Sequence, residues 1–440
     1  MRILILLSLW IAGLAGGCAS PEPITTIESR TGLSGDPVTI RIENAPETVR
    51  IIAERNWGWP ETTLHRSSAV FQSVNGVIDV SENAPVSGSY SGVSPAGLFW
   101  AMKNTDEADA QERASALVTF EVDYMNDGTI DFVTAVDLKS ANDAFEEVNV
   151  TPDLPGAFLY LPDGVDRPPV IIAMGGSEGG DRSARRLGSK FASRGYAVLG
   201  LPYYSPAYGN QEQQFPELPR TFVDIPVDKI EIARDWLRQR EDVDASRLAL
   251  YGVSKGAELA LVAASKIEGI SAVIAIVPTD VIWEGWGSGA EAGTTSSFSW
   301  RGQPLPFMPY YKMEEEIAKF SDPNANARMR TPHDAGREAY PERLNEARIR
   351  VEAIDAPVFL VGGDKDDVWA SGPMARTIKA TRDAAGLSTE LYVDPGAGHY
   401  LSGDGYAPMY AFLDEEDAAV EARLRVQAWQ AMMVFLIENL

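Results

Sequence analysis

A serine flanked by glycines between a strand and a helix constrains this chain more than any other feature. Residues 252–256 read Gly-Val-Ser-Lys-Gly, directly after the apolar run 247–251 and directly before the helix-like run 257–264. Small neighbours are needed because Ser254 would occupy a strained turn packed closely against the next strand and helix. The pentapeptide alone is common, but in this order of elements it predicts a nucleophile elbow.

The pattern around this motif alternates strands with helices from residue 146 to residue 440, which predicts a mainly parallel sheet flanked by helices. The expected strands are residues 156–161, 170–174, 197–201, 248–251, 272–277, 358–361 and 390–393, and the expected helices are residues 183–193, 227–240, 256–265 and 419–438. An aromatic-rich insertion at about residues 279–350 has no periodicity and predicts a lid. Its Trp283, Trp286 and Trp300 either line an acyl pocket or fix the insertion to the sheet.

The preceding part of the chain has the two-residue period of half-buried strands. Residues 118–124 alternate apolar and polar side chains, and an Asn-Asp-Gly turn follows at residues 126–128. Short strands with turn signals and no long helix predict an immunoglobulin-like β-sandwich over residues 36–145. A chain of 440 residues is long enough for two such cores.

The first 18 residues have the pattern of a secretion signal: a charged start, an apolar stretch and small residues before Cys18. This pattern resembles a bacterial lipoprotein signal, in which Cys18 becomes the lipidated first residue of the mature chain. An ordinary cleaved signal and a buried N-terminal helix are the alternatives. Residues 19–35, rich in Ser, Pro, Thr and Gly, are expected to form a tether. We therefore expect a lipid-anchored protein of the cell envelope, at the outer membrane or facing the periplasm.

The overall charge excludes one class of partner. The chain has 38 basic and 63 acidic residues, a formal net charge of -25, and one cysteine. Nucleic acid is not an expected partner, because binding to phosphates needs a basic surface. We also expect no metal, no cofactor and no disulfide.

A serine nucleophile needs an imidazole to take its proton, and the imidazole needs a carboxylate to orient it. Of the three histidines, only His399 follows an expected strand within a Gly-rich loop. His65 is expected to be a surface or hydrogen-bonded histidine, and His333 is expected to face solvent. The loop after the strand at residues 358–361 offers Asp364, Asp366 and Asp367 as the carboxylate. The chain order Ser, Asp, His is the order of α/β-hydrolases.

The developing oxyanion needs two hydrogen-bond donors. The backbone N–H of Lys255, at the start of the helix after the serine, is one candidate. The Gly-rich residues 174–180 follow an early strand, and Gly176 and Ser177 there are candidates for the second donor. A phosphate-binding loop is the rival interpretation of this stretch, but the Gly-Lys-Ser/Thr ending is absent.

Four stretches together resemble the family of acyl-CoA thioester hydrolases and bile acid-CoA:amino acid N-acyltransferases, from about residue 36 to the end. They are residues 88–92 with 97–101, residues 175–176 with 192–197, residues 252–258, and the loops at Asp366 and 398–400. The Ser-Lys-Gly-Ala-Glu sequence starting at Ser254 is the most specific. The resemblance implies Ser254 as nucleophile, His399 as base and Asp366, by its spacing to Trp369, as carboxylate.

The resemblance also implies a reaction. The conjugating acyltransferases use cysteine, so serine indicates hydrolysis of an acyl thioester through an acyl-enzyme. The loop departs from the family, which has His-Asn where this chain has Asp367-Val368. An envelope carboxylesterase or lipase-like enzyme acting on oxygen esters is the alternative, followed by an acyltransferase and by a non-catalytic binding lipoprotein.

Overall fold

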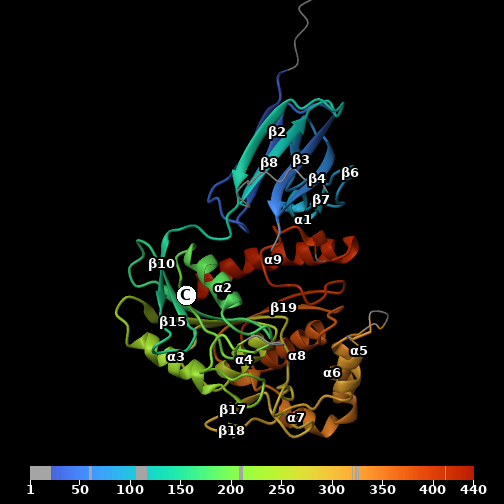
Figure 1. Ribbon diagram of the computed structural model, residues 1–440. Helices are drawn as coiled ribbons and strands as arrows, with labels where there is room; N and C mark the ends of the chain where they lie inside the picture. Colours follow the sequence, from blue (N-terminus) through green and yellow to red (C-terminus); the bar gives the residue numbers. More distant parts are fainter. Residues whose placement is uncertain are drawn as a thin grey trace, which may run out of the picture.

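The computed structural model describes residues 21–58, 62–105, 116–207, 212–319, 321–322, 325, 327–411 and 413–440. Its N-terminal part consists of two antiparallel sheets (Figure 1), one with the strand order β1-β2-β5 and one with the order β6-β4-β3-β8-β9, to which β7 adds by pairing with β4. The elements are β1 (Ile24–Ser29), β2 (Val38–Glu43), β3 (Thr48–Trp57), β4 (Thr63–Gln72), β5 (Val77–Asp79), β6 (Ser87–Gly88), α1 (Gly97–Trp100), β7 (Lys103–Asn104), β8 (Leu117–Asp123) and β9 (Phe132–Asp137).

Strand β1 corrects the predicted tether over residues 19–35. All of β1 pairs with β2, so the β-structure begins at Ile24. The strand was missed because Ile27 is its only buried side chain, and one buried residue gives no visible alternation. Residues 1–20, with Cys18 and the predicted signal, lie outside the described residues.

The second part of the chain is an eight-stranded sheet with the order β10-β11-β13-β12-β15-β16-β19-β20. Its strands are β10 (Phe145–Asn149), β11 (Phe158–Pro162), β12 (Pro169–Met174), β13 (Ala197–Gly200), β15 (Asp244–Val253), β16 (Ala272–Ile276), β19 (Val358–Gly363) and β20 (Thr389–Asp394). The parallel strands of this sheet are β13, β12, β15, β16, β19 and β20, whereas β10 and β11 are antiparallel. The parallel sheet agrees with the sequence-based prediction, which did not include β10.

Helices cover both faces of this sheet, as parallel strands require. They are α2 (Arg182–Ala192), α3 (Asp228–Arg238), α4 (Lys255–Ala264), α8 (Ser371–Ala384) and α9 (Glu415–Asn439). Side chains of α3, α4 and α8 share one core with the sheet, and those of α2 and α9 share the other. Along β12, Ile172 and Met174 point to the first core and Ile171 to the second.

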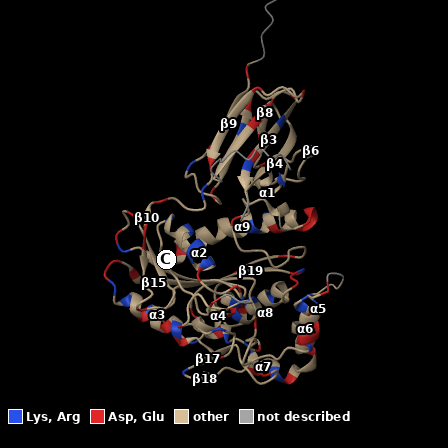
Figure 2. Cartoon of the chain, viewed as in Figure 1, with Lys and Arg blue, Asp and Glu red and all other residues tan. Residues whose placement is uncertain are grey.

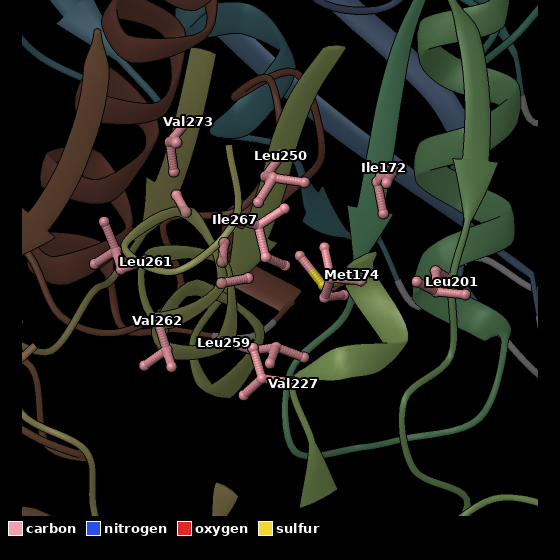
Figure 3. Close-up of a cluster of buried hydrophobic side chains, with 14 of the residues drawn as sticks. Ile172, Met174, Leu201, Val227, Leu250, Leu259, Leu261, Val262, Ile267 and Val273 are labelled. Atoms are coloured by element: carbon pink, nitrogen blue, oxygen red, sulfur yellow. The ribbon is translucent and has the colours of Figure 1, made fainter. Parts of the chain in front are cut away.

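Figure 3 shows the first of these cores, where strand residues such as Leu250 and Val273 meet Leu259 and Leu261 of α4. Complete burial of one such side chain stabilises a fold by roughly 1.5–3 kcal/mol. This packing fixes α4 against the strand that precedes it, and therefore fixes the turn between them.

The insertion between β16 and β19 has its own elements. They are β17 (Phe298–Trp300), β18 (Gln303–Pro304), α5 (Met313–Lys319), α6 (Arg330–Ala339), η1 (Pro341–Arg343), α7 (Leu344–Ala347) and η2 (Val351–Ala353). Strands β17 and β18 form a small sheet with β14 (Ile225–Pro226). A further short helix, η3, spans Met409–Ala411.

Helix α9 lies between the two parts of the molecule (Figure 1). Its Ala418, Ala422 and Val426 belong to the core of the N-terminal β-structure, whereas Trp429 and Phe435 belong to the core of the large sheet. No helix among the described residues has both the length and the apolar character needed to span a bilayer.

Candidate active site

Ser254 stands on a strained turn between β15 and α4. Its φ of 54° and ψ of -119° lie outside the regions that L-residues favour. The flanking glycines are required by close backbone contacts. A Cβ on Gly252 would lie 2.1 Å from the Gly256 carbonyl oxygen, and one on Gly256 would lie 2.1 Å from that of Gly175. The Ser254 N–H donates to Ile276 O at 2.8 Å, which ties the turn to the neighbouring strand.

His399 and Asp366 reach Ser254 because all three follow parallel strands of one sheet, whose carboxyl ends meet at one edge. His399 Nε2 lies 3.0 Å from Ser254 Oγ, and its Nδ1 lies 2.8 Å from Asp366 Oδ2. Asp366 is fully buried. Because an ionised carboxylate only accepts, Nδ1 carries the proton and Nε2 is free to accept from the serine hydroxyl.

The structure distinguishes the three neighbouring aspartates. Asp366 Oδ1 accepts the backbone N–H groups of Val368 at 2.9 Å and Trp369 at 3.2 Å. Asp364 forms an ion pair with Arg376, and Asp367 is exposed. The spacing to Trp369 matters physically because the turn that ends at this tryptophan supplies both backbone donors.

The other two histidines are buried. The prediction that His333 faces solvent is wrong: it lies in α6 beneath the site, and its Nδ1 is 2.6 Å from Met329 O. Its ring packs edge-on against Trp283 and contacts Trp369. Burial lowers the pKa of His333 to about 3, so this imidazole is neutral at pH 7. His65 is buried too, with its Nδ1 3.2 Å from Thr63 O.

The Gly-rich loop after β12 lies beside Ser254. A Cβ on Gly176 would be 3.3 Å from Ser254 Cβ. The Gly176 N–H donates to Glu178 Oε1 at 3.1 Å, so this candidate oxyanion donor already has an acceptor. Lys255 is the first residue of α4, where backbone N–H groups lack acceptors within the helix. The sequence analysis did not single out Glu178, although a carboxylate within this Gly-rich run was a signal that could have identified it.

The Lys255 side chain is held in a buried ion pair. Its Nζ is buried and bonds Glu258 Oε2 at 2.8 Å, while Glu258 Oε1 accepts the Trp283 N–H at 2.9 Å. Burial lowers the pKa of Lys255 and raises that of Glu258. This pair connects the helix behind Ser254 to the insertion. It therefore gives the Lys and Glu of the Ser-Lys-Gly-Ala-Glu stretch a structural role.

Ser254 and His399 open into a cavity of about 550 Å³ between the two parts of the chain. Gly176, Ser177 and Glu178 line it on one side, and β3 contributes Arg55 and Trp57. A second cavity of about 610 Å³ also reaches His399 and is lined by residues such as Arg330 and Lys365. No group of His, Cys, Asp or Glu among the described residues has the arrangement of a metal site.

The three tryptophans predicted for the substrate pocket do not line either of these cavities. Trp283 is fully buried and stacks on Tyr310. Trp286 and Trp300 pack against the core of the large sheet. Of the two roles expected for them, the structure supports attachment of the insertion to the sheet.

Comparison with known proteins identifies the family. Residues 225–440 match the description "BAAT / Acyl-CoA thioester hydrolase C terminal", and residues 35–138 match "Acyl-CoA thioester hydrolase/BAAT N-terminal region". The chain belongs to the acyl-CoA thioester hydrolase/BAAT family. Residues 156–284 also match the dienelactone hydrolase family, and the large domain has the α/β-hydrolase fold.

Curated relatives are aligned over most of their length. Mouse acyl-coenzyme A thioesterase 1 is 24% identical, covering 92% of this chain and 94% of its own. Human acyl-coenzyme A thioesterase 6 is 24% identical over 97% of this chain and 95% of its own length. Among solved structures, the Est2 esterase of Thermogutta terrifontis aligns with 17% identity and a TM-score of 0.40, over 67% of this chain and 94% of its own. As a member of the acyl-CoA thioester hydrolase/BAAT family, the chain is an enzyme of the hydrolase class.

Proposed function

We propose that this protein is a serine hydrolase that cleaves acyl thioesters through an acyl-enzyme on Ser254. The observation that carries the proposal is the hydrogen-bonded series from Ser254 Oγ to His399 and from His399 to the buried Asp366, at the wall of a cavity. The thioester substrate is inferred from relatives named acyl-coenzyme A thioesterases.

The mechanism follows from the positions of these groups. His399 Nε2 takes the hydroxyl proton as Ser254 Oγ attacks the acyl carbon, and Asp366 stabilises the imidazolium that results. The backbone N–H groups of Lys255 and Ser177 would stabilise the oxyanion, and that of Gly176 would contribute only after it leaves Glu178 Oε1. The thiol leaves with the proton from His399, and a water activated by the same imidazole then releases the carboxylic acid.

Labelling with a fluorophosphonate probe tests this chemistry. The wild-type protein is expected to be labelled on Ser254, and Ser254→Ala to remain unlabelled while unfolding at the same temperature. Equal labelling of a folded Ser254→Ala variant would contradict the assignment. An unlabelled wild-type protein would favour a binding lipoprotein.

The leaving group is the second question. Matched acyl series on N-acetylcysteamine and on an alcohol of similar size distinguish a thioesterase from a carboxylesterase. We expect higher kcat/KM for the thioester at every chain length. Consistently higher values for the oxygen ester would support the carboxylesterase alternative, and product formation with an added amine would indicate an acyltransferase.

We also propose a location and an architecture. Cys18 is proposed to carry lipid and hold the enzyme at the bacterial cell envelope, which mass spectrometry of the mature N-terminus tests. An unmodified terminus, or one beginning elsewhere, would contradict the anchor. The N-terminal β-structure is proposed to be an immunoglobulin-like sandwich, and residues 279–350 to act as a lid.

A further inference from the structure

The cavity that contains Ser254 has several cationic side chains, although the chain as a whole has a net charge of -25. Its lining residues include Arg55, Arg186, Lys190 and Arg425 against the carboxylates of Glu178 and Asp404. Lys190 and Asp404 form a buried ion pair, so their charges largely offset each other. The positive charge that remains is concentrated in the arginines.

Arg425 comes from α9 and faces the cavity. Its guanidinium donates to Tyr400 O and contacts Met409 Sδ at 3.1 Å. It forms no ion pair with any carboxylate in the described part of the chain. Burial lowers its pKa to about 10, so the side chain stays charged at neutral pH. A charged guanidinium in a partly desolvated cavity interacts strongly with an anion placed beside it.

Arg186 reaches the same cavity from α2. It lies on one helix face with Ser183 and Lys190, which also line the cavity. Its side chain is exposed and, like that of Arg425, has no ion pair within the described residues. Its neighbour Arg185 is different, because it is held by Asp181 and Glu147 and does not line the cavity. Figure 2 shows basic residues on α2 where this helix lies beside α9.

The two arginines and Ser254 line the same cavity. Glu421 and Asp404 favour the charged form of Arg425 and Arg186 opposes it, and both arginines act on the hydroxyl of Tyr251, three residues before Ser254. The wall around them is largely apolar, with Leu187, Tyr251 and Trp429. Glu421 and Asp404 act favourably on charged Arg425, but neither forms an ion pair with Arg186 or Arg425 within the described residues, and Asp404 is already paired with Lys190. An anion placed beside both guanidinium groups would therefore be stabilised.

We propose that Arg186 and Arg425 form an anion subsite that binds a carboxylate or phosphate group of the substrate while Ser254 attacks its acyl carbon. The proposal rests on the hydrolase function above and adds a substrate class: acyl compounds with a negative group away from the bond that breaks. The planar guanidinium fork suits both kinds of anion. The anion can belong to the acyl chain, as a terminal carboxylate, or to the leaving group, as a phosphate.

Four thioesters distinguish these sources: hexanoyl and adipoyl groups, which have equal chain length, each on neutral N-acetylcysteamine and on coenzyme A. The measured quantity is the ratio of kcat/KM between an anionic substrate and hexanoyl-N-acetylcysteamine. In Arg186→Gln and Arg425→Gln we expect this ratio to fall by roughly 10- to 100-fold, the effect of removing one hydrogen bond between charged groups. Arg182→Gln and Arg423→Gln remove the same charge from the same helices, outside the cavity lining, and should leave the ratio unchanged.

A fall confined to the adipoyl substrates places the anion on the acyl chain, and a fall confined to coenzyme A substrates places it on the leaving group. Unchanged ratios, or equal falls in the control variants, would overturn the subsite. Because Arg425 is partly buried, the exposed Arg186 provides the test if Arg425→Gln does not fold. Failure of the proposed function is a separate outcome, seen as no hydrolysis of any thioester by the wild-type protein.

Discussion

Replacing Asp366 by asparagine would test the active site most directly. The change keeps the volume of the side chain and one of its two acceptors. In the structure, Asp366 Oδ1 accepts the N–H groups of Val368 and Trp369 and lies 2.9 Å from His399 Nδ1, whereas Oδ2 lies 2.8 Å from the same Nδ1. An asparagine that keeps the two backbone hydrogen bonds must place its NH₂ group at the position of Oδ2.

Two donors would then face each other, and His399 would relieve the conflict by moving its proton from Nδ1 to Nε2. A protonated Nε2 cannot accept the proton of Ser254, from which it is separated by 3.0 Å. The corresponding loss in a serine–histidine–aspartate triad is about 10⁴ in kcat, or about 5 kcal/mol of transition-state stabilisation. Because the backbone hydrogen bonds survive, KM and the unfolding temperature should change little.

Stopped-flow hydrolysis of an activated ester measures this loss in both the acylation burst and the steady state. Asp367→Asn is the matched control, since that side chain is exposed one residue away, and Asp364→Asn removes only the ion pair with Arg376. Both controls should retain activity within a few-fold of wild type. The reasoning would be refuted if a folded Asp366→Asn retained more than a tenth of wild-type kcat, or if either control lost as much.

Three further predictions concern groups around the site. His333, with its pKa lowered to about 3, binds a proton more readily when unfolded, so it should reduce the free energy of unfolding by about 2 kcal/mol between pH 7 and pH 5. Urea titrations of His333→Gln should show a smaller decrease in the free energy of unfolding over this pH range. A decrease identical to that of the wild type would contradict the buried neutral imidazole. Asp404→Asn leaves Lys190 buried without its counterion and should lower the free energy of unfolding by about 3–5 kcal/mol. The exposed Asp367→Asn is the control, and a change below about 1 kcal/mol in Asp404→Asn would argue against the ion pair. Arg330 donates to the backbone carbonyl oxygen of Asp366, so Arg330→Gln should mainly lower kcat, with a fold-change in kcat roughly ten times the fold-change in KM. A change in KM alone would assign Arg330 to substrate binding.

The strand-end positions were the predictable part of the site. Ser254, Asp366 and His399 each follow an apolar run, and a parallel sheet must bring such ends together. The position of His333 was not predictable, because its burial depends on how α6 packs beneath Trp369 and Trp283. No periodicity in the insertion carries that information.

Side chains that meet only through the tertiary fold were also beyond the sequence. Arg186 and Arg425 are separated by more than half the chain, and no local pattern relates them. Nor does the sequence show that Arg185 is held by Asp181 and Glu147, and Lys255 by Glu258, so that neither side chain lines the cavity.

The position of α9 has a consequence for the order in which the molecule is completed. The first-synthesised β-structure has in its core Tyr406, Met409 and three side chains of α9, all from the last tenth of the sequence. During synthesis this domain therefore cannot exclude water from that side until residues 406–426 have been made. A chain truncated before α9 would expose apolar surface on both domains.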